Sequence, residues 1–228
     1  MRDQIFSSAV PALPFYTVFV DVRRRVLISI LVLVAAGPLF AASRPVLVCF
    51  GDSITAGYGV QPGQAYPDAL QKKLDGEGYH YNVVNEGTSG ATTKDAVASL
   101  PMVLKLHPSV VIVEFGGNDG LRGLPLNQSR RNLDEVITAL QNAHAKVLLA
   151  GITLPPNYGP DYIHAFDAIF REVAEKHRVA LVPMIYKNLV NVPGTIQPDG
   201  IHPTAKGAGI VADTILPALK PLLRKDRD

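Results

Sequence analysis

The stretch VLVCFGDSITAGYG at residues 46–59 joins an apolar run to a serine that is flanked by glycines. A run of consecutive apolar residues rich in valine and leucine is typical of a parallel strand that is covered on both faces. Gly51 then allows a sharp turn at the carboxyl end of the strand, which is the edge where open α/β sheets bind their ligands. We therefore expect Ser53 to lie at the ligand-binding edge of a parallel sheet.

The rest of the chain repeats this pattern of strand and helix. Apolar runs at 81–84, 110–114, 147–150 and 179–182 predict four more strands, and apolar residues at helical spacing separate them. Strands that alternate with helices pair in parallel through right-handed crossovers. The sequence thus predicts a single three-layer α/β/α domain with about five parallel strands. Pro101 predicts a break or kink in one helix, and the last helix is expected at about 205–223.

A catalytic interpretation of Ser53 requires a base, a group that orients the base, and donors for an oxyanion. Asp199 and His202 lie three residues apart in one predicted loop. That spacing allows Asp199 to accept the Nδ1 proton of His202 while Nε2 faces a serine. Asn118 follows one predicted strand and offers a side-chain amide, and Gly90 follows another and offers a backbone N–H. Groups from several strand ends therefore converge on one chemistry.

Each of these residues also has a simpler interpretation. Ser53 can be a turn or helix-capping residue, Asn118 can be a turn residue, and Asp199 can stabilise a turn beside a solvated His202. Among the six histidines, however, only His202 has a carboxylate placed to orient it. No pair of histidines has metal-ligand spacing with a third ligand nearby, so we do not expect a hydrolytic metal. No cofactor is expected either. Thr55, two residues after the serine, differs from the Gly-x-Ser-x-Gly elbow, and no Gly-Lys-Ser/Thr phosphate loop follows.

Four segments in this order resemble the four blocks of the SGNH, or GDSL, hydrolases: GDSI at 51–54, Gly90, GGND at 116–119 and DGIHP at 199–203. The resemblance covers nearly all of residues 46–223 and is closest to the exported bacterial arylesterase, acyl-CoA thioesterase I and lysophospholipase branch. It includes GNDGLRG at 117–123 and LPPNYG at 154–159. One departure is Ile54, where the name-giving motif has leucine, and this change conserves volume.

The resemblance implies a flavodoxin-like SGNH hydrolase fold and a serine esterase that hydrolyses carboxylic esters and thioesters through an acyl-enzyme. Asp52 and Asp119 are expected to hold the site loops in shape. The implied site consists of the catalytic residues Ser53, Asp199 and His202 and an oxyanion hole formed by Ser53, Gly90 and Asn118.

Apolar residues after two of the predicted strands could wall an acyl pocket, or they could only pack the loops. They are Leu121, Leu124, Leu126, Ile152, Leu154, Pro155, Pro156 and Tyr158. Aryl esters, acyl thioesters and lysophospholipids are the substrates that the resemblance implies. One alternative is a carbohydrate deacetylase with a preference for acetyl groups. Another is a non-catalytic flavodoxin-like module that holds a phosphate with loop 51–59, although such a module would not need Asp199 and His202.

Residues 1–43 have a different character. Three arginines at 23–25 precede an apolar run at 26–36, and small residues follow at 41–43. This order is typical of a secretory signal peptide. The run is too short for a membrane span, which takes about 20 residues, so cleavage is favoured over a retained anchor. We expect an exported protein, periplasmic or secreted, through the general secretory route, although the paired arginines also fit twin-arginine export. A start codon placed too early would explain the long segment 1–22.

Composition limits the remaining function classes. The 228 residues suit one domain, which we place at 44–223 before a charged tail at 224–228. A hydrophobic content of 47% and a net charge of +2 argue against disorder and against a nucleic-acid partner. The lone cysteine, Cys49, is expected to pack as a small hydrophobe, and an internal disulfide is excluded. The expected partner is a small ester or lipid, and the chain is expected to be a monomer or weak oligomer.

Overall fold

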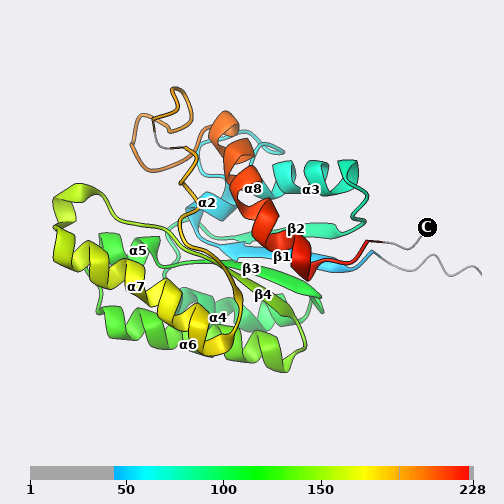
Figure 1. Ribbon diagram of the computed structural model, residues 1–228, viewed down its shortest axis with the longest axis horizontal. Coiled ribbons are helices and arrows are strands. Elements are labelled where there is room, and N and C mark those ends of the chain that lie inside the picture. Colours follow the sequence, from blue (N-terminus) through cyan, green and yellow to red (C-terminus); the bar gives the residue numbers. More distant parts are fainter. Residues whose placement is uncertain (1–43, 190, 226–228) are drawn as a thin grey trace, which may run out of the picture. The chain divides into compact units, whose positions relative to one another are not determined.

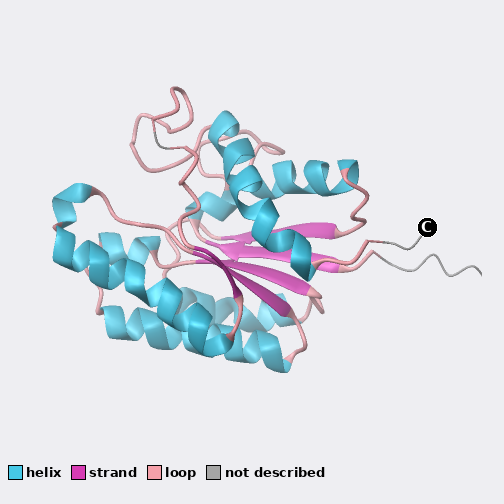
Figure 2. Ribbon diagram, viewed as in Figure 1, coloured by secondary structure: helices cyan, strands magenta, loops and turns pink. Residues whose placement is uncertain are grey.

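Five strands of the described residues form one parallel sheet in the order β2-β1-β3-β4-β5 (Figures 1 and 2). The computed structural model describes residues 44–189 and 191–225. Every neighbouring pair of strands is parallel. The predicted α/β architecture with about five parallel strands is therefore confirmed. The strands are β1 (Val46–Gly51), β2 (Asn82–Gly87), β3 (Val110–Glu114), β4 (Lys146–Ala150) and β5 (Ala180–Val182).

Helices cover both faces of this sheet. Helices α3 and α8 pack together on one face, and α4, α6 and α7 pack side by side on the other (Figure 1). Because both faces are covered, the strands are apolar on both sides, as the continuous apolar runs predict. The helices are α2 (Ser53–Ala56), α3 (Tyr66–Gly76), α4 (Thr93–Leu104), α5 (Gly117–Leu121), α6 (Leu126–Asn142), α7 (Pro160–His177) and α8 (Ala205–Leu219), with 3₁₀ turns η1 (Pro156–Tyr158) and η2 (Lys220–Leu222).

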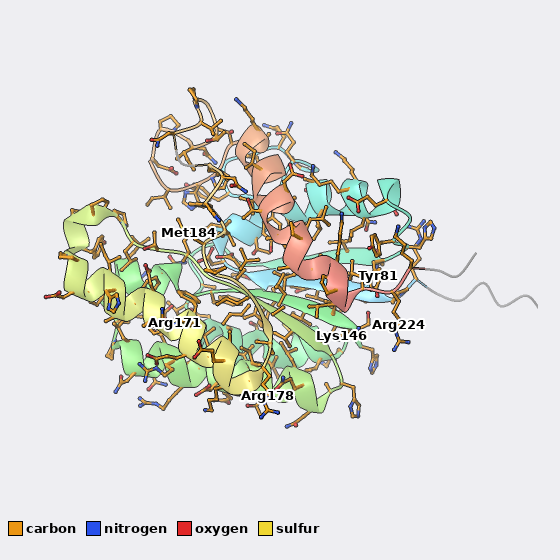
Figure 3. All side chains as sticks on the ribbon, in the orientation of Figure 1. Tyr81, Lys146, Arg171, Arg178, Met184 and Arg224 are labelled. Carbon is orange, nitrogen blue, oxygen red and sulfur yellow. The ribbon has the colours of Figure 1, made fainter. Side chains whose placement is uncertain are left out.

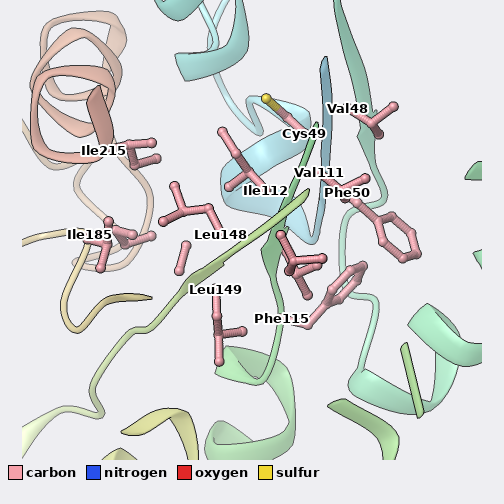
Figure 4. Packing of buried hydrophobic residues seen from close by; sticks show 14 of the residues in the cluster. Val48, Cys49, Phe50, Val111, Ile112, Phe115, Leu148, Leu149, Ile185 and Ile215 are labelled. Carbon is pink, nitrogen blue, oxygen red and sulfur yellow. The ribbon is translucent and has the colours of Figure 1, made fainter. Parts of the chain in front are cut away.

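The core lies on both sides of the central strands. On one side, Cys49, Ile112 and Leu148 are register neighbours on β1, β3 and β4, and Ile215 of α8 lies over the same face (Figure 4). Burial raises the pKa of the Cys49 thiol to about 12, so this cysteine packs as an unreactive small hydrophobe. On the other side, Phe50 contacts the ring of the residue that follows β3, Phe115, edge to face at 4.7 Å between centroids.

Helix α4 is continuous through its proline, so of the predicted break or kink at Pro101 the break does not occur. The helix begins with a capping box, in which Thr92 and Asp95 each bind the other's backbone N–H. Its buried face includes Leu100 and Val103, on both sides of the proline in sequence. Pro101 lies in the last turn and removes only one helical hydrogen bond there, which this packing offsets.

Two element ends also differ from the prediction. β2 extends three residues past the expected end at residue 84, because its last three residues pair with residues 49–51 of β1. α8 ends at Leu219, before the expected end at residue 223. Pro221 lies in the 3₁₀ turn that follows, where a residue without an N–H is tolerated.

The predicted signal peptide at 1–43 lies outside the described residues, as does the end of the charged tail at 226–228. Within the part of the chain that the structure describes, no helix combines the length and the apolar character needed to cross a bilayer.

The strand order places a topological switch point between β1 and β3. After β1 the chain crosses to β2 on one side, and it then returns to β3 on the other side. Loops diverge at such a point and leave a crevice outside the carboxyl ends of the strands. Ser53 follows β1 and Asn118 follows β3, so both lie at this crevice.

Candidate active site

Ser53 is the first residue of helix α2, immediately after β1. The helix is capped by Asp52, whose Oδ1 accepts the N–H of Ile54 at 3.0 Å. Ser53 is therefore not the capping residue, and its own N–H has no acceptor among the described residues. The turn before it needs glycine, because a β-carbon at Gly51 would lie 2.7 Å from the carbonyl oxygen of Glu114.

Ser53, His202 and Asp199 form a chain of hydrogen bonds. Nε2 of His202 lies 2.8 Å from Oγ of Ser53, and Nδ1 lies 2.7 Å from Oδ2 of Asp199. The other carboxylate oxygen, Oδ1, accepts the N–H groups of Ile201 at 2.9 Å and His202 at 3.0 Å. Since an ionised carboxylate can only accept hydrogen bonds, Nδ1 carries the proton and Nε2 is free to accept the serine proton. The structure thus brings together the three residues that sequence analysis assigned to catalysis.

Asp199 is held in its ionised form. Partial burial favours its neutral form, but two backbone N–H groups and His202 outweigh this effect and lower the pKa of Asp199 from 3.8 to about 2. Its side chain remains 37% exposed, so water screens its charge in part. No group of three or more His, Cys, Asp or Glu side chains is placed to hold a metal ion within the described residues.

Three residues that the sequence did not single out brace the loop around His202. The hydroxyl of Tyr186 donates to the carbonyl of Ile201 at 2.9 Å. The amide of Gln197 donates to the carbonyls of Tyr58 at 2.7 Å and Pro203 at 2.8 Å. The ring of Tyr58 lies 4.6 Å from the imidazole of His202, between centroids. These contacts join segments far apart in sequence, so no spacing in the chain could have revealed them.

Asn118 lies in the short helix α5, which begins after Gly116 in a left-handed conformation with φ of 117°. Its Nδ2 donates to Oδ2 of Asp52 at 3.1 Å and to the carbonyl of Ala91 at 3.0 Å. Both amide hydrogens therefore have acceptors in the protein without substrate. For this amide to bind an oxyanion, one of the two hydrogen bonds must be shared or given up.

Gly90 follows β2 in a left-handed conformation with φ of 81°. Its N–H has no acceptor within the described residues. Its carbonyl accepts Nη2 of Arg122 at 2.9 Å, and the same nitrogen lies 3.4 Å from Oδ1 of Asn118. Arg122 therefore links the two segments that carry the expected oxyanion donors. Arg122 lies within the GNDGLRG segment, and nothing in the sequence alone indicates a role for it.

Asp119 is buried and connects three helices. Its Oδ2 accepts the N–H of Thr93 at 2.9 Å, and its Oδ1 accepts the hydroxyls of Thr93 at 2.5 Å and Ser129 at 2.9 Å. These bonds tie α5 to the start of α4 and to α6, and such contacts hold the Asn118 segment in place, as the sequence suggested.

Two adjoining cavities open at the carboxyl edge of the sheet. The smaller, of about 120 Å³, is lined by Ser53, Asn118 and His202 among others. The larger, of about 270 Å³, is mainly apolar. Both are lined by Leu121 and Ile152, so an apolar groove leads away from the serine.

The expected acyl wall is present only in part. Leu121, Ile152, Leu154, Pro155 and Pro156 line the larger cavity, together with Met184 and Tyr186, which sequence analysis did not predict (Figure 3 labels Met184). Leu124, Leu126 and Tyr158 do not line either cavity. Leu124 is exposed and Leu126 packs against the core, whereas the hydroxyl of Tyr158 donates to the carbonyl of Leu121 at 2.8 Å. Tyr158 therefore supports the cavity wall through its hydrogen bond to Leu121 and does not line the cavity itself.

Comparison with known proteins places this arrangement in a family. Residues 49–210 match the model of the GDSL-like Lipase/Acylhydrolase family. The chain belongs to this family. The matched region contains Ser53, Asp199 and His202. The family resemblance found in the sequence is confirmed.

Relatives in the family carry enzyme names. The chain is 43% identical to "Esterase TesA" of Pseudomonas aeruginosa over 183 residues, which cover 80% of this chain and 91% of that protein. It is 38% identical to "Thioesterase 1/protease 1/lysophospholipase L1" of Escherichia coli K12 over 187 residues, 82% of this chain and 88% of that protein. A crystal structure of TesA matches with a TM-score of 0.76 at 44% identity, covering 78% of this chain and 99% of the other. The expectation of an ester-cleaving hydrolase is thereby confirmed.

Proposed function

We propose that this chain is an exported serine esterase that cleaves aryl esters, acyl thioesters and lysophospholipids through an acyl-enzyme at Ser53. The observation that carries the assignment is the hydrogen-bonded chain from Ser53 through His202 to Asp199, at the mouth of an apolar groove. The names of the relatives support the substrate classes, and the sequence of residues 1–43 supports export.

The proposed reaction begins with proton transfer from Ser53 to Nε2 of His202 as the serine oxygen attacks the carbonyl carbon. The Asp199 carboxylate stabilises the imidazolium that forms. The N–H groups of Ser53 and Gly90, which have no acceptor in the described part of the chain, bind the oxyanion, and the amide of Asn118 shares one of its hydrogens with it. His202 then gives its proton to the leaving alcohol or thiol. Water attacks the acyl-serine through the same base and releases the acid.

The apolar groove favours acyl chains longer than acetyl. Each methylene buried in it contributes about 0.8 kcal/mol, which corresponds to about fourfold in kcat/KM if it is fully realised in the transition state. A carbohydrate deacetylase would gain nothing from such a groove. Chain-length preference therefore separates the two hydrolases.

The decisive experiment measures hydrolysis of nitrophenyl esters from acetate to palmitate by the purified protein, Ser53→Ala and the control Ser99→Ala. Ser99 lies on α4, and among the described residues its hydroxyl bonds only to carbonyls of the same helix. We expect activity through medium or long chains that Ser53→Ala abolishes and Ser99→Ala retains. Activity confined to acetate would favour a deacetylase. Ser53→Ala within tenfold of wild type would refute the mechanism.

A further inference from the structure

A fully buried carboxyl group, Glu114, lies beneath the turn that carries Ser53. It is the last residue of β3 and the register partner of Gly51. Its carbonyl accepts the N–H of Asp52 at 3.2 Å, and its Oε2 accepts the hydroxyl of Thr55 at 2.8 Å. Oε2 also lies 3.4 Å from the N–H of Asp52. The backbone and the side chain of one residue thus both bind the turn.

The second carboxyl oxygen of Glu114 is the exception in this network. Oε1 is buried, and no donor among the described residues reaches it. An unpartnered charged oxygen in the protein interior is very unfavourable. A proton on Oε1 would turn it from an orphan acceptor into a donor, and the Asp52 side chain, which forms a hydrogen bond with the carboxyl group of Glu114, supplies the acceptor.

The charges around Glu114 also disfavour its ionised form. Glu114 and Asp52 interact with each other. The other titratable groups that interact with one or both of them are Tyr66 of α3, Tyr186 after β5 and His202. Cys49 of β1 contacts Tyr66. No lysine or arginine forms an ion pair with either carboxyl group within the described residues. An ionised Glu114 would therefore be a second buried negative charge beside Asp52.

We propose that Glu114 is a positioning residue that acts as a neutral acid, donating its proton to Asp52 and accepting from Thr55. The proposal rests on the proposed function, because the atoms that Glu114 fixes are those of the nucleophile turn and of an oxyanion donor. Asp52 passes the constraint on: its Oδ1 holds the N–H of Ile54 at 3.0 Å and its Oδ2 holds the amide of Asn118 at 3.1 Å. The proton on Glu114 thus fixes the orientation of Asp52, and Asp52 in turn holds the Ser53 turn and the amide of Asn118.

The titration behaviour of the pair agrees with this geometry. Burial, and then the charge of Asp52, raise the pKa of Glu114 well above 4.5. Burial raises the pKa of Asp52 to about 6, opposed by hydrogen bonds from Ile54, Glu114 and Asn118 and by His202. Both directions fit a pair that holds one proton and one negative charge, as two carboxyl groups that share a site do.

Glutamine is the matched substitution, because its amide reproduces a neutral acid with one acceptor and a donor that cannot ionise. We expect Glu114→Gln to keep kcat for nitrophenyl butyrate within about threefold. Glu114→Met keeps the volume but removes both functions, and a misplaced catalytic group can cost about 10² in rate, so we expect that loss in kcat with KM within threefold. A kcat of Glu114→Met equal to or higher than that of Glu114→Gln would overturn the proposal. A kcat of Glu114→Gln as low as that expected for Glu114→Met would also overturn it.

Stability against pH tests the proton itself, independently of catalysis and even if Glu114→Met fails to fold. The folded pKa of Glu114 is raised, so its stabilising contribution is complete below the unfolded value and declines as pH rises toward the folded value. The glutamine of Glu114→Gln does not titrate, so its contribution to stability does not change with pH. Between about pH 7 and 8.5, where Asp52 with its pKa of about 6 is largely ionised, the unfolding equilibrium constant of wild type relative to Glu114→Gln should rise by up to about tenfold per pH unit.

The control is Glu135→Gln, which removes an exposed carboxyl group on α6. Its unfolding constant relative to wild type should not change with pH in that window. A Glu114→Gln ratio constant within twofold would show that Glu114 is ionised in the folded state and would overturn the proposal. Failure of the proposed function has a different signature, namely an active Ser53→Ala variant.

Discussion

Asparagine in place of Asp199 should impair catalysis more than alanine does. Oδ1 of Asp199 accepts two backbone N–H groups, and Oδ2 faces Nδ1 of His202. In Asp199→Asn the side-chain oxygen must stay with the two backbone donors, so the amide NH₂ faces Nδ1. That contact forces the proton of His202 onto Nε2, where it prevents acceptance of the Ser53 proton.

The magnitude follows from two contributions. Unit charges separated by the 2.7 Å between Nδ1 and Oδ2 interact by about 1.5 kcal/mol in water and about 6 kcal/mol at an effective dielectric constant of 20. Because the Asp199 side chain is 37% exposed, we take a value between these limits and expect both variants to lose about 10²–10³ in kcat. In Asp199→Asn the hydrogen bond between the amide and Nδ1 of His202, worth about 1 kcal/mol, must also break before the imidazole can adopt the active tautomer. This lowers kcat by about another fivefold.

The assay is kcat for nitrophenyl butyrate with Asp199→Asn, Asp199→Ala, Ser53→Ala and His202→Ala, with folding checked by circular dichroism. Both Asp199 variants should retain more activity than the Ser53 and His202 variants, since an orienting group contributes less than the nucleophile and base. An Asp199→Asn variant that is faster than Asp199→Ala, or within tenfold of wild type, would refute the tautomer argument.

Four further predictions concern the same site. Asn118→Ala should lower kcat by about 10²–10³ with little change in KM, measured in the same assay, because an oxyanion donor acts in the transition state. Arg122→Gln should lower kcat by about tenfold, because the link between Gly90 and Asn118 is lost; no change in kcat would show that the link is dispensable. Ile152→Trp should shorten the preferred acyl chain in the nitrophenyl ester series, with about fourfold lost in kcat/KM per excluded methylene, and an unchanged profile would place the acyl chain elsewhere. The low folded pKa of Asp199 gives stability that is complete above about pH 4 and is lost as pH falls toward 2, so the melting-temperature gap between wild type and Asp199→Ala should narrow in that range.

The parts of the site that the sequence could predict are those at strand ends. Ser53, Asn118 and Asp119 follow apolar runs whose parallel pairing brings their ends to one edge, so local pattern and fold class together locate them. Asp199 and His202 were found because their spacing within one loop has a chemical meaning. Local chemistry and strand order therefore suffice for the reacting groups.

The supporting groups could not be predicted for a physical reason. Tyr186 and Met184 reach the groove because β5 ends beside β4, and Arg122 reaches Gly90 across the crevice. These contacts depend on loop paths that no periodicity encodes. Conversely, Leu124 has the apolar character of a pocket residue but lies exposed in the loop before α6. In the sequence, Glu114 has the character of an ordinary polar residue at the end of a strand. Only the structure shows that its carboxyl group is completely buried.

Both ends of the described chain lie at the edge of the sheet opposite the serine. Arg44 precedes β1, and at the other end the N–H of Arg224 donates to the hydroxyl of Tyr81, just before β2 (Figure 3). Lys146, the first residue of β4, binds the carbonyl of Leu222 at the same edge. A fusion partner or a solid support attached at residue 44 or 225 would therefore leave the entrance of the groove pointing into bulk solution. Immobilised or displayed forms of the enzyme can be attached at these positions without obstructing substrate entry.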